Sequence, residues 1–166
     1  LLNHGGDSWE EFVNQKARFF INNQDGTFTE KAMESLVASR SQGRGISCSD
    51  FDRDGDIDIF IVNNVGRPEF YENRVRGSLN SKDNFISLSL RVSGTNAVAI
   101  GSKVWLTAAG KTQYREMRLE NNFISTNSPE LHFGLADAAS IDEIRIRWPG
   151  GSETVLNSVD ANQFLQ

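Results

Sequence analysis

Apolar residues recur at every second position through most of the chain, a period that predicts β-strands rather than helices. The segment FISLSLRV, residues 85–92, places four apolar residues on one face: Ile86, Leu88, Leu90 and Val92. The segment EIRIRW, residues 143–148, alternates in the same way, with charged residues between its apolar ones. Both patterns predict half-buried antiparallel strands.

A β-hairpin is predicted where two alternating segments flank Gly110. In this prediction Val104 and Leu106 face Met117 and Leu119 across the two strands. The predicted fold class is therefore all-β.

Two shorter segments predict loops or turns. Residues 30–39 have a spacing that allows a short helix, although a loop fits them as well. The sequence PGG at residues 149–151 predicts a turn that ends the preceding strand.

A weak internal repeat, which we call the echo, occurs only in the first half of the chain and so predicts two domains. The segments that begin at residues 1 and 19 share an apolar pair, an asparagine and an aspartate beside glycine, and residues 69–74 repeat the beginning of this pattern. The echo stops near Asn84, where a different run of strands begins. We place the boundary in the polar stretch 77–83, which gives domains at residues 1–78 and 79–166.

Composition excludes several classes of protein. A chain of 166 residues can bury one good core or two small ones. Its formal net charge of -5 equals the five aspartates of one loop, so a nucleic acid would find no basic patch. No apolar run approaches the roughly 20 residues of a membrane span. Cys48, as the one cysteine, cannot form an intrachain disulfide and is predicted to be a small buried residue.

The loop SDFDRDGDID, residues 49–58, holds the chemistry-bearing motif. Counting Asp50 as position one, carboxylates fall at positions one, three, five, seven and nine: Asp50, Asp52, Asp54, Asp56 and Asp58. Gly55 at position six supplies a sharp bend, which is the oxygen-donor order of a calcium loop. Position twelve is Ile61 rather than glutamate, and both flanks are strand-like, so the motif is not an EF-hand. The Asp56 side chain is expected to lie in water, with only its carbonyl available.

A divalent cation explains this crowding of like charges. Carboxylates about 4 to 6 Å apart repel each other by roughly a kcal/mol per pair at a protein surface. Ca²⁺ is favoured because the donors are all oxygen, numerous and held on a flexible turn, whereas Zn²⁺ would need histidine or thiolate ligands. The alternative is a solvated acidic turn at a sheet edge. Arg53 is expected to point into solvent.

Other candidate residues favour structural roles. His132 has no partner nearby in sequence and lies in a strand pattern, while His4 would meet a metal only through tertiary folding. Three tryptophans could stack on a sugar but are more typical of core or edge positions: Trp9, Trp105 and Trp148. No nucleophile elbow, P-loop or HExxH motif occurs, so we expect a protein that is not an enzyme.

These motifs resemble two known modules in tandem. FFINNQDGTFTEKA, GRGISCSDFDRDGDIDIFIVNN and RPEFYENR are similar to an FG-GAP/VCBS repeat, a blade of the integrin-alpha type of β-propeller. The later landmarks AIGSKV, LHFGL and IRWPGG resemble an ASPIC/UnbV domain.

The resemblance implies a propeller-blade-like antiparallel sheet with a calcium loop, followed by a β-sandwich-like module. It implies that the five loop aspartates bind Ca²⁺. It also implies that the protein is extracellular or lies at the cell surface. The implied function is a calcium-binding structural or adhesion module, with calcium-dependent carbohydrate binding as the alternative.

One blade leaves open sheet edges. Either the chain ends a longer protein, or the blade packs on the second module or on another subunit. A homo-oligomer or filament formed through these edges, or a protein or glycan ligand, is therefore an expected partner.

Overall fold

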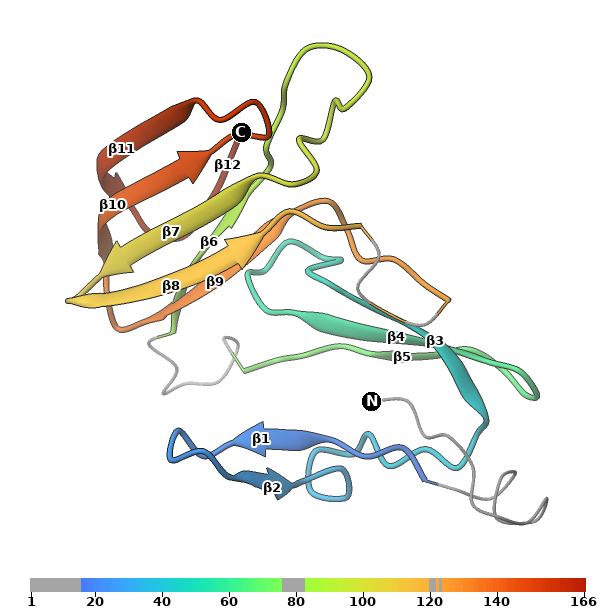
Figure 1. Cartoon of the computed structure of the whole chain (residues 1–166). Helices are drawn as coiled ribbons and strands as arrows, with labels where there is room; N and C mark the ends of the chain where they lie inside the picture. The colour runs from blue at the N-terminus through green and yellow to red at the C-terminus, as the bar shows by residue number, and fades with distance from the viewer. Residues whose placement is uncertain (1–15, 76–82, 120–121, 123) are drawn as a thin grey trace. The chain divides into compact units, whose positions relative to one another are not determined.

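The computed structural model describes residues 16–75, 83–119, 122 and 124–166. These residues form β-strands joined by turns and loops, and no helix occurs among them, so the predicted all-β class is confirmed (Figure 1). The chain divides into two compact units, each made of more than one segment. Unit 1 contains residues 1–49, 58–72 and 122–126, and unit 2 contains residues 50–57, 73–121 and 127–166. The predicted boundary at 77–83 stays a prediction, because residues 76–82 lie outside the described residues.

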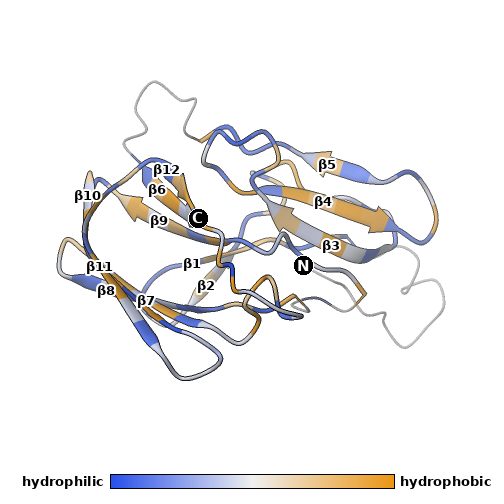
Figure 2. Ribbon diagram, turned by 90° about the horizontal axis from the view of Figure 1, so that it is seen from above, coloured by the Kyte–Doolittle hydropathy of each residue, from blue (hydrophilic) through white to orange (hydrophobic). Residues whose placement is uncertain are grey.

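Unit 1 holds two small antiparallel sheets. The first pairs β1 (Phe20–Asn22) with β2 (Phe28–Glu30). The second has the order β3-β4-β5, with β3 at Gly43–Ser49, β4 at Asp58–Asn63 and β5 at Glu69–Tyr71. The central strand β4 is largely hydrophobic (Figure 2), and Ile61 within it is buried. Residues 32–36 form turns, so the loop interpretation of residues 30–39 is confirmed over the helical one.

Unit 2 is built from a three-stranded and a four-stranded sheet. The three-stranded sheet has the order β12-β6-β9, and the four-stranded sheet has the order β11-β10-β7-β8. The strand bounds are β6 Asn84–Leu88, β7 Lys103–Ala108, β8 Lys111–Glu116, β9 Leu131–Ala136, β10 Ser140–Arg147, β11 Glu153–Asp160 and β12 Gln163–Leu165.

Both sheets contribute to one hydrophobic core, which makes unit 2 a β-sandwich-like module. Ile86 and Phe133 come from the three-stranded sheet, and Leu106, Ile141 and Ile144 come from the four-stranded sheet. All five side chains are fully buried. The alternation predicted for β10 is confirmed, since its apolar residues face this core while Arg145 and Arg147 are exposed.

The strand predicted at residues 85–92 differs in two respects. It ends at Leu88, and it is buried on both faces rather than half-buried. The physical reason is that side chains from the neighbouring strands β12 and β9 pack over its second face. Ile86 enters the core on one face, while Phe85 packs against Phe164 and stacks on His132, with ring centroids 5.2 and 5.6 Å away.

The hairpin around Gly110 is confirmed, but its predicted pairing partners are wrong. The turn has two residues with positive φ, Ala109 at 47° and Gly110 at 72°, which suits the twist of the flanking strands. This short turn pairs Val104 with Arg115 and Leu106 with Gln113. Met117 lies beyond the end of β8, where its N–H donates to the carbonyl of Ser102.

The turn predicted at residues 149–151 is confirmed. Gly151 has a φ of 87°, and its N–H donates to the carbonyl of Trp148.

Side chains of β8 satisfy carbonyls of β9, the edge strand of the neighbouring sheet. Gln113 Nε2 donates to the carbonyl of Gly134 over 2.7 Å, and Arg115 Nε donates to that of His132 over 2.8 Å. The Arg115 guanidinium also lies 5.3 Å from the ring centroid of Phe133. These side-chain bonds join β8 to β9, which belong to different sheets and are not paired by their backbones. We call this border between the two sheets the seam.

A hydrogen-bonded carboxylate fixes β5 in unit 1. Glu69 accepts bonds from Ser39 Oγ (2.7 Å), Asn63 Nδ2 (3.1 Å) and Tyr71 OH (2.5 Å). Partial burial by itself would raise the pKa of Glu69, but these bonds outweigh it and hold the pKa below the ordinary value. Burial, together with the bond to Glu69 and its charge, raises the pKa of Tyr71 to about 12.

The seam generates a stability prediction. Gln113→Ala should lower the free energy of unfolding by about 1 kcal/mol, because the carbonyl of Gly134 loses its donor. Urea denaturation measures this change. Lys111→Ala, an exposed position on the same strand, is the control. Equal stability of the two variants would contradict the prediction.

The Glu69 network generates a pH prediction. A carboxyl whose folded pKa is lowered stabilises the fold above its unfolded pKa, and this stabilisation is lost as pH falls through the folded value. Glu69→Gln should therefore be less stable than the parent at pH 7, and the difference should shrink below the ordinary pKa of 4.5. Denaturation curves from pH 7 down to pH 3 measure it, with Glu153→Gln on the exposed surface of β11 as control. A difference that is constant with pH would refute the prediction.

Candidate metal centre

Four of the five predicted aspartates lie on the turn that joins β3 to β4, and the fifth, Asp58, is the first residue of β4. Ser49 at the end of β3 pairs with Asp58 at the start of β4, so an antiparallel pair closes the base of the turn. The prediction that the loop joins two strands is confirmed. Ile61, at the position where an EF-hand needs glutamate, lies in β4 and is 4% exposed.

Hydrogen bonds between side chains and backbone shape this turn. Gly55 adopts a φ of 98°, which favours glycine, and its N–H donates to Asp50 Oδ2 over 2.9 Å. Asp52 Oδ1 accepts from the N–H of Asp54 over 3.2 Å, and Asp54 Oδ1 accepts from that of Asp56 over 2.8 Å. Bonds of this kind, from an aspartate to the backbone two residues on, are typical of tight turns.

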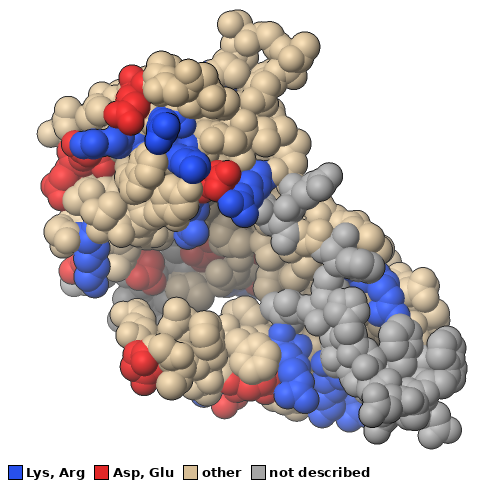
Figure 3. All heavy atoms as spheres, in the orientation of Figure 1, with Lys and Arg blue, Asp and Glu red and all other residues tan. Residues whose placement is uncertain are grey.

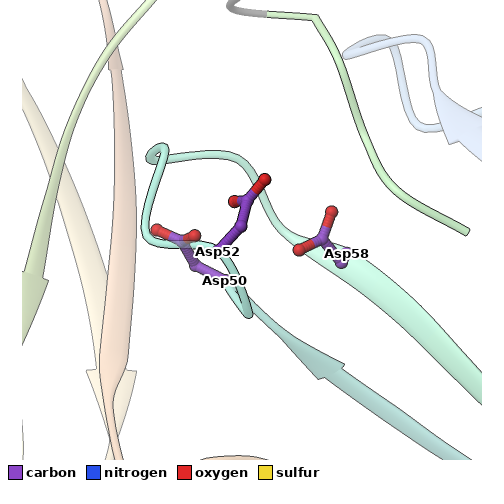
Figure 4. Close-up of side chains that lie close together, drawn as sticks. All are labelled: Asp50, Asp52 and Asp58. Carbon is purple, nitrogen blue, oxygen red and sulfur yellow. The ribbon is translucent and has the colours of Figure 1, made fainter.

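Three of the five carboxylates form a compact cluster. Asp50, Asp52 and Asp58 each offer one oxygen, and these oxygens all lie within 4.8 Å of one another (Figure 4). Asp58 is 1% exposed and Asp50 is 7% exposed, whereas Asp52 is open to solvent. Like charges at this separation, two of them withdrawn from water, oppose folding unless a proton or a cation neutralises them.

Asp50 is the member of the cluster with an unsatisfied atom. Its Oδ2 accepts the bond from Gly55, but its buried Oδ1 has no hydrogen-bond partner. Burial raises the pKa of Asp50, the bond from Gly55 opposes that rise, and the charges of Asp54 and Asp52 add to it. A buried carboxylate oxygen with no donor is costly, and a cation is the kind of group that would satisfy it.

The other two aspartates lie outside the cluster. Asp54 is exposed and bonds the backbone of the turn. Asp56 was expected to have its side chain in water, and this is wrong, because it is only 8% exposed. The sharp bend carries Gly55 and Asp56 together into the buried part of the loop.

Arg53 corrects a second expectation, since its side chain does not simply point into solvent. Its guanidinium lies 3.8 Å from the ring centroid of Phe164, and its Nη1 lies 3.5 Å from Glu130 Oε1, all within unit 2. Glu130 also accepts bonds from Ser87 and Ser89. The side chain stays about half exposed, so the ion pair contributes little by itself.

The remaining candidate residues show structural contacts. His132 stacks on Phe85, and Trp148 donates from Nε1 to Thr154 Oγ1 over 2.9 Å. Cys48 is only partly buried, and this burial raises the pKa of its thiol. His4 and Trp9 lie outside the described residues.

Sequence reasoning missed the Glu69 network. Ser39 and Glu69 are thirty positions apart, so no local spacing connects them. Only the pairing of β5 with β4 brings the donors around this carboxylate.

Comparison with known families supports the modular organisation. Residues 6–61 match the family model of the FG-GAP-like repeat, and residues 92–166 match that of ASPIC and UnbV. The two matches follow one another along the chain in the predicted order. FG-GAP repeats are propeller blades and are typical of extracellular proteins. The comparison with curated proteins found no match.

Within the described residues, no helix is long and apolar enough to cross a membrane. The two modules together suggest a β-propeller-like module of the extracellular or adhesion type.

The unsatisfied oxygen of Asp50 generates a prediction for protein kept free of divalent ions by a chelator. Asp50→Asn should raise the free energy of unfolding by about 1 kcal/mol, because it removes a buried charge while its amide oxygen can still accept from Gly55. Thermal unfolding in chelator measures this change, with exposed Asp137→Asn as the matched control. A clear loss of stability for Asp50→Asn would count against the interpretation.

Proposed function

We propose that the β3–β4 turn binds Ca²⁺ and that the protein is a calcium-stabilised extracellular module used for structure or adhesion. The observation that carries this proposal is the buried Oδ1 of Asp50, which has no hydrogen-bond partner and belongs to a carboxylate clustered with those of Asp52 and Asp58. The cluster supplies oxygen donors alone, the donor type that calcium prefers. Asp54, Asp56 and backbone carbonyls of the turn are further candidate donors.

Calcium suits this donor set better than other ions. Zinc and copper favour imidazole and thiolate ligands, and the clustered residues are all aspartates. Magnesium demands near-octahedral geometry and keeps its waters, whereas calcium accepts six to eight oxygens at variable angles. A short turn with aspartates of unequal exposure fits the more tolerant ion.

The proposed role of the ion is structural. An ion held by Asp50 and Asp52 would tie the turn to Asp58, the first residue of β4. It would replace repulsion among the carboxylates by coordination, and so stabilise the β3–β4 pair. We propose a non-enzymatic role, with the ion holding the module in shape rather than activating a substrate.

Self-association is a second candidate function, favoured by the surface of the β1–β2 sheet. All residues of these two strands are exposed, including the large apolar side chains of Phe20 (53%) and Phe28 (62%). An exposed two-stranded sheet with apolar side chains is a plausible contact for a second copy. Calcium-dependent carbohydrate binding stays the alternative, to be tested by glycan binding with and without chelator.

The calcium proposal predicts a thermal shift. Calcium at about 100 times its dissociation constant should add about 2.7 kcal/mol to the free energy of unfolding. Asp58→Asn should remove most of this gain, because the variant loses a carboxylate that is almost fully buried in the cluster. Thermal unfolding with calcium and with chelator measures the difference.

Two controls sharpen this test. Asp142→Asn, at an exposed position of β10, should keep the full calcium response. Asp54→Asn tests a residue that lies outside the cluster, and a partial response would identify it as a further donor. Identical unfolding of the parent protein with calcium and with chelator would defeat the proposal.

The second candidate predicts a change in molecular mass. Phe28→Ser should reduce any association seen by light scattering at increasing protein concentration, because it removes exposed apolar surface from β2. Thr29→Ser on the same strand is the control. A parent protein that stays monomeric at high concentration would exclude this candidate.

A further inference from the structure

The solvent-facing side of the four-stranded sheet in unit 2 carries an aromatic row. Strand register places Tyr114 of β8, Trp105 of β7, Arg145 of β10 and Val155 of β11 directly side by side. The rings of Trp105 and Tyr114 lie 5.3 Å apart between centroids and are tilted by 44°. Tyr114 is 48% exposed and Val155 is 43% exposed, so the row presents apolar surface to solvent. We call this side of the sheet the outer face.

A pair of like charges lies beside the aromatic row. Lys103 of β7 and Arg147 of β10 are directly opposite each other, an arrangement that destabilises a sheet. Glu116 lies opposite Lys103 and accepts a 2.6 Å bond from Arg118; this bond, and then the charges of Arg118 and Lys103, hold the pKa of Glu116 below its ordinary value. Among the described residues Arg147 forms no ion pair, although Glu153 is its register partner on β11.

Arg145, which lies within the row, already forms an ion pair. Arg145 donates to Glu143 Oε1, with its Nη2 at 3.1 Å and its Nε at 3.3 Å. Its guanidinium is therefore held in place next to Trp105. Acidic and basic side chains are interspersed over this part of the surface (Figure 3), so hydrogen-bonding groups border the apolar row.

A sugar ring that bears a carboxylate fits both features at once. One face of a pyranose presents C–H groups, which match the electron-rich face of an exposed aromatic ring. Its hydroxyl groups lie at the rim, where the flanking charged and polar side chains can bond them. A carboxylate on the ring would meet the ammonium of Lys103 and the guanidinium of Arg147, and would relieve their repulsion.

We propose that the outer face binds an acidic glycan, with a uronate ring stacked on Tyr114 and Trp105 and its carboxylate bound by Lys103 and Arg147. This site goes beyond the proposed calcium role and does not depend on it, because none of its residues lies in the β3–β4 turn. The site would give the proposed adhesion module an acidic glycan as its partner. Binding should therefore persist when a chelator removes divalent ions.

Isothermal titration calorimetry of the full chain in chelator tests this proposal. The probe is a glucuronate-containing oligosaccharide from hyaluronan, and its matched control is the same oligosaccharide with the carboxyl groups reduced to alcohols. The expected result is binding of the acidic form with about tenfold or greater preference over the reduced form. Absence of binding, equal binding of both forms, or binding that requires calcium would overturn the proposal.

Variants assign the binding to the outer face. Arg147→Glu and Tyr114→Ala should each weaken binding about tenfold or more, since one removes the charge and the other the stacking surface. Arg91→Glu makes the same charge change at an exposed position outside the sheet and should leave binding unchanged. Phe70→Ala, an exposed aromatic of β5, is the control for the ring. Thermal unfolding confirms that each variant is folded.

Two results would overturn the assignment even if the acidic probe binds. An equal loss with Arg91→Glu would mean attraction by overall charge. A poly-glutamate peptide that binds as tightly as the sugar, with an affinity unaffected by Tyr114→Ala, would identify an acidic protein as the partner class. A missing calcium response in thermal unfolding would defeat the calcium proposal and leave this one standing.

Discussion

The interaction on which the candidate site depends is the burial of acidic oxygens that the protein itself does not fully neutralise. A carboxylate removed from water needs donors, and the N–H of Gly55 donates to one oxygen of Asp50 while the other oxygen has no hydrogen-bond partner. The carboxylate to which this second oxygen belongs is clustered with those of Asp52 and Asp58. Hydrogen bonds to the backbone of the turn bring these carboxylates together, and a bound cation would neutralise their charge. The turn that brings these carboxylates together is therefore also what makes a cation necessary.

Polar side chains elsewhere replace strands at the edges of the sheets. In unit 1, Ser125 Oγ accepts from the N–H of Ile46 and donates to its carbonyl, and Asn122 Nδ2 donates to the same carbonyl. These bonds satisfy the outer side of β3, which pairs with β4 on its other side. Gly45 lies close to these bonds, since a Cβ there would be in van der Waals contact with Ser125 Cβ, 3.4 Å away. The open edges expected of a single blade are thus partly covered from within the chain.

The sequence predicted those features that local pattern determines. Period-two alternation identified the strand pair around Gly110 and the buried face of β10, because side chains of a strand point alternately to its two faces. The spacing of the aspartates located the turn between β3 and β4. It could not separate Asp50, Asp52 and Asp58 from Asp54 and Asp56, since all five share one spacing. That separation depends on how the bend at Gly55 turns each side chain.

Features set by long-range pairing were not predictable in this way. Nothing local in FISLSLRV shows that Phe164 and His132 pack against Phe85, so the second buried face of β6 was missed. The donors around Glu69 and the aromatic row of the outer face come from segments that only strand register aligns. Arg53 was misjudged for the same reason, because its contacts Phe164 and Glu130 are distant in sequence.

The bonds from Gln113 and Arg115 to β9 bear on how copies of this protein can join. An edge strand invites another chain when its carbonyls stand vacant, and two of those on β9 are already occupied by side chains. An incoming strand would have to displace a charged guanidinium and an amide before it could pair there. End-to-end growth into fibres is thereby discouraged along the β9 edge.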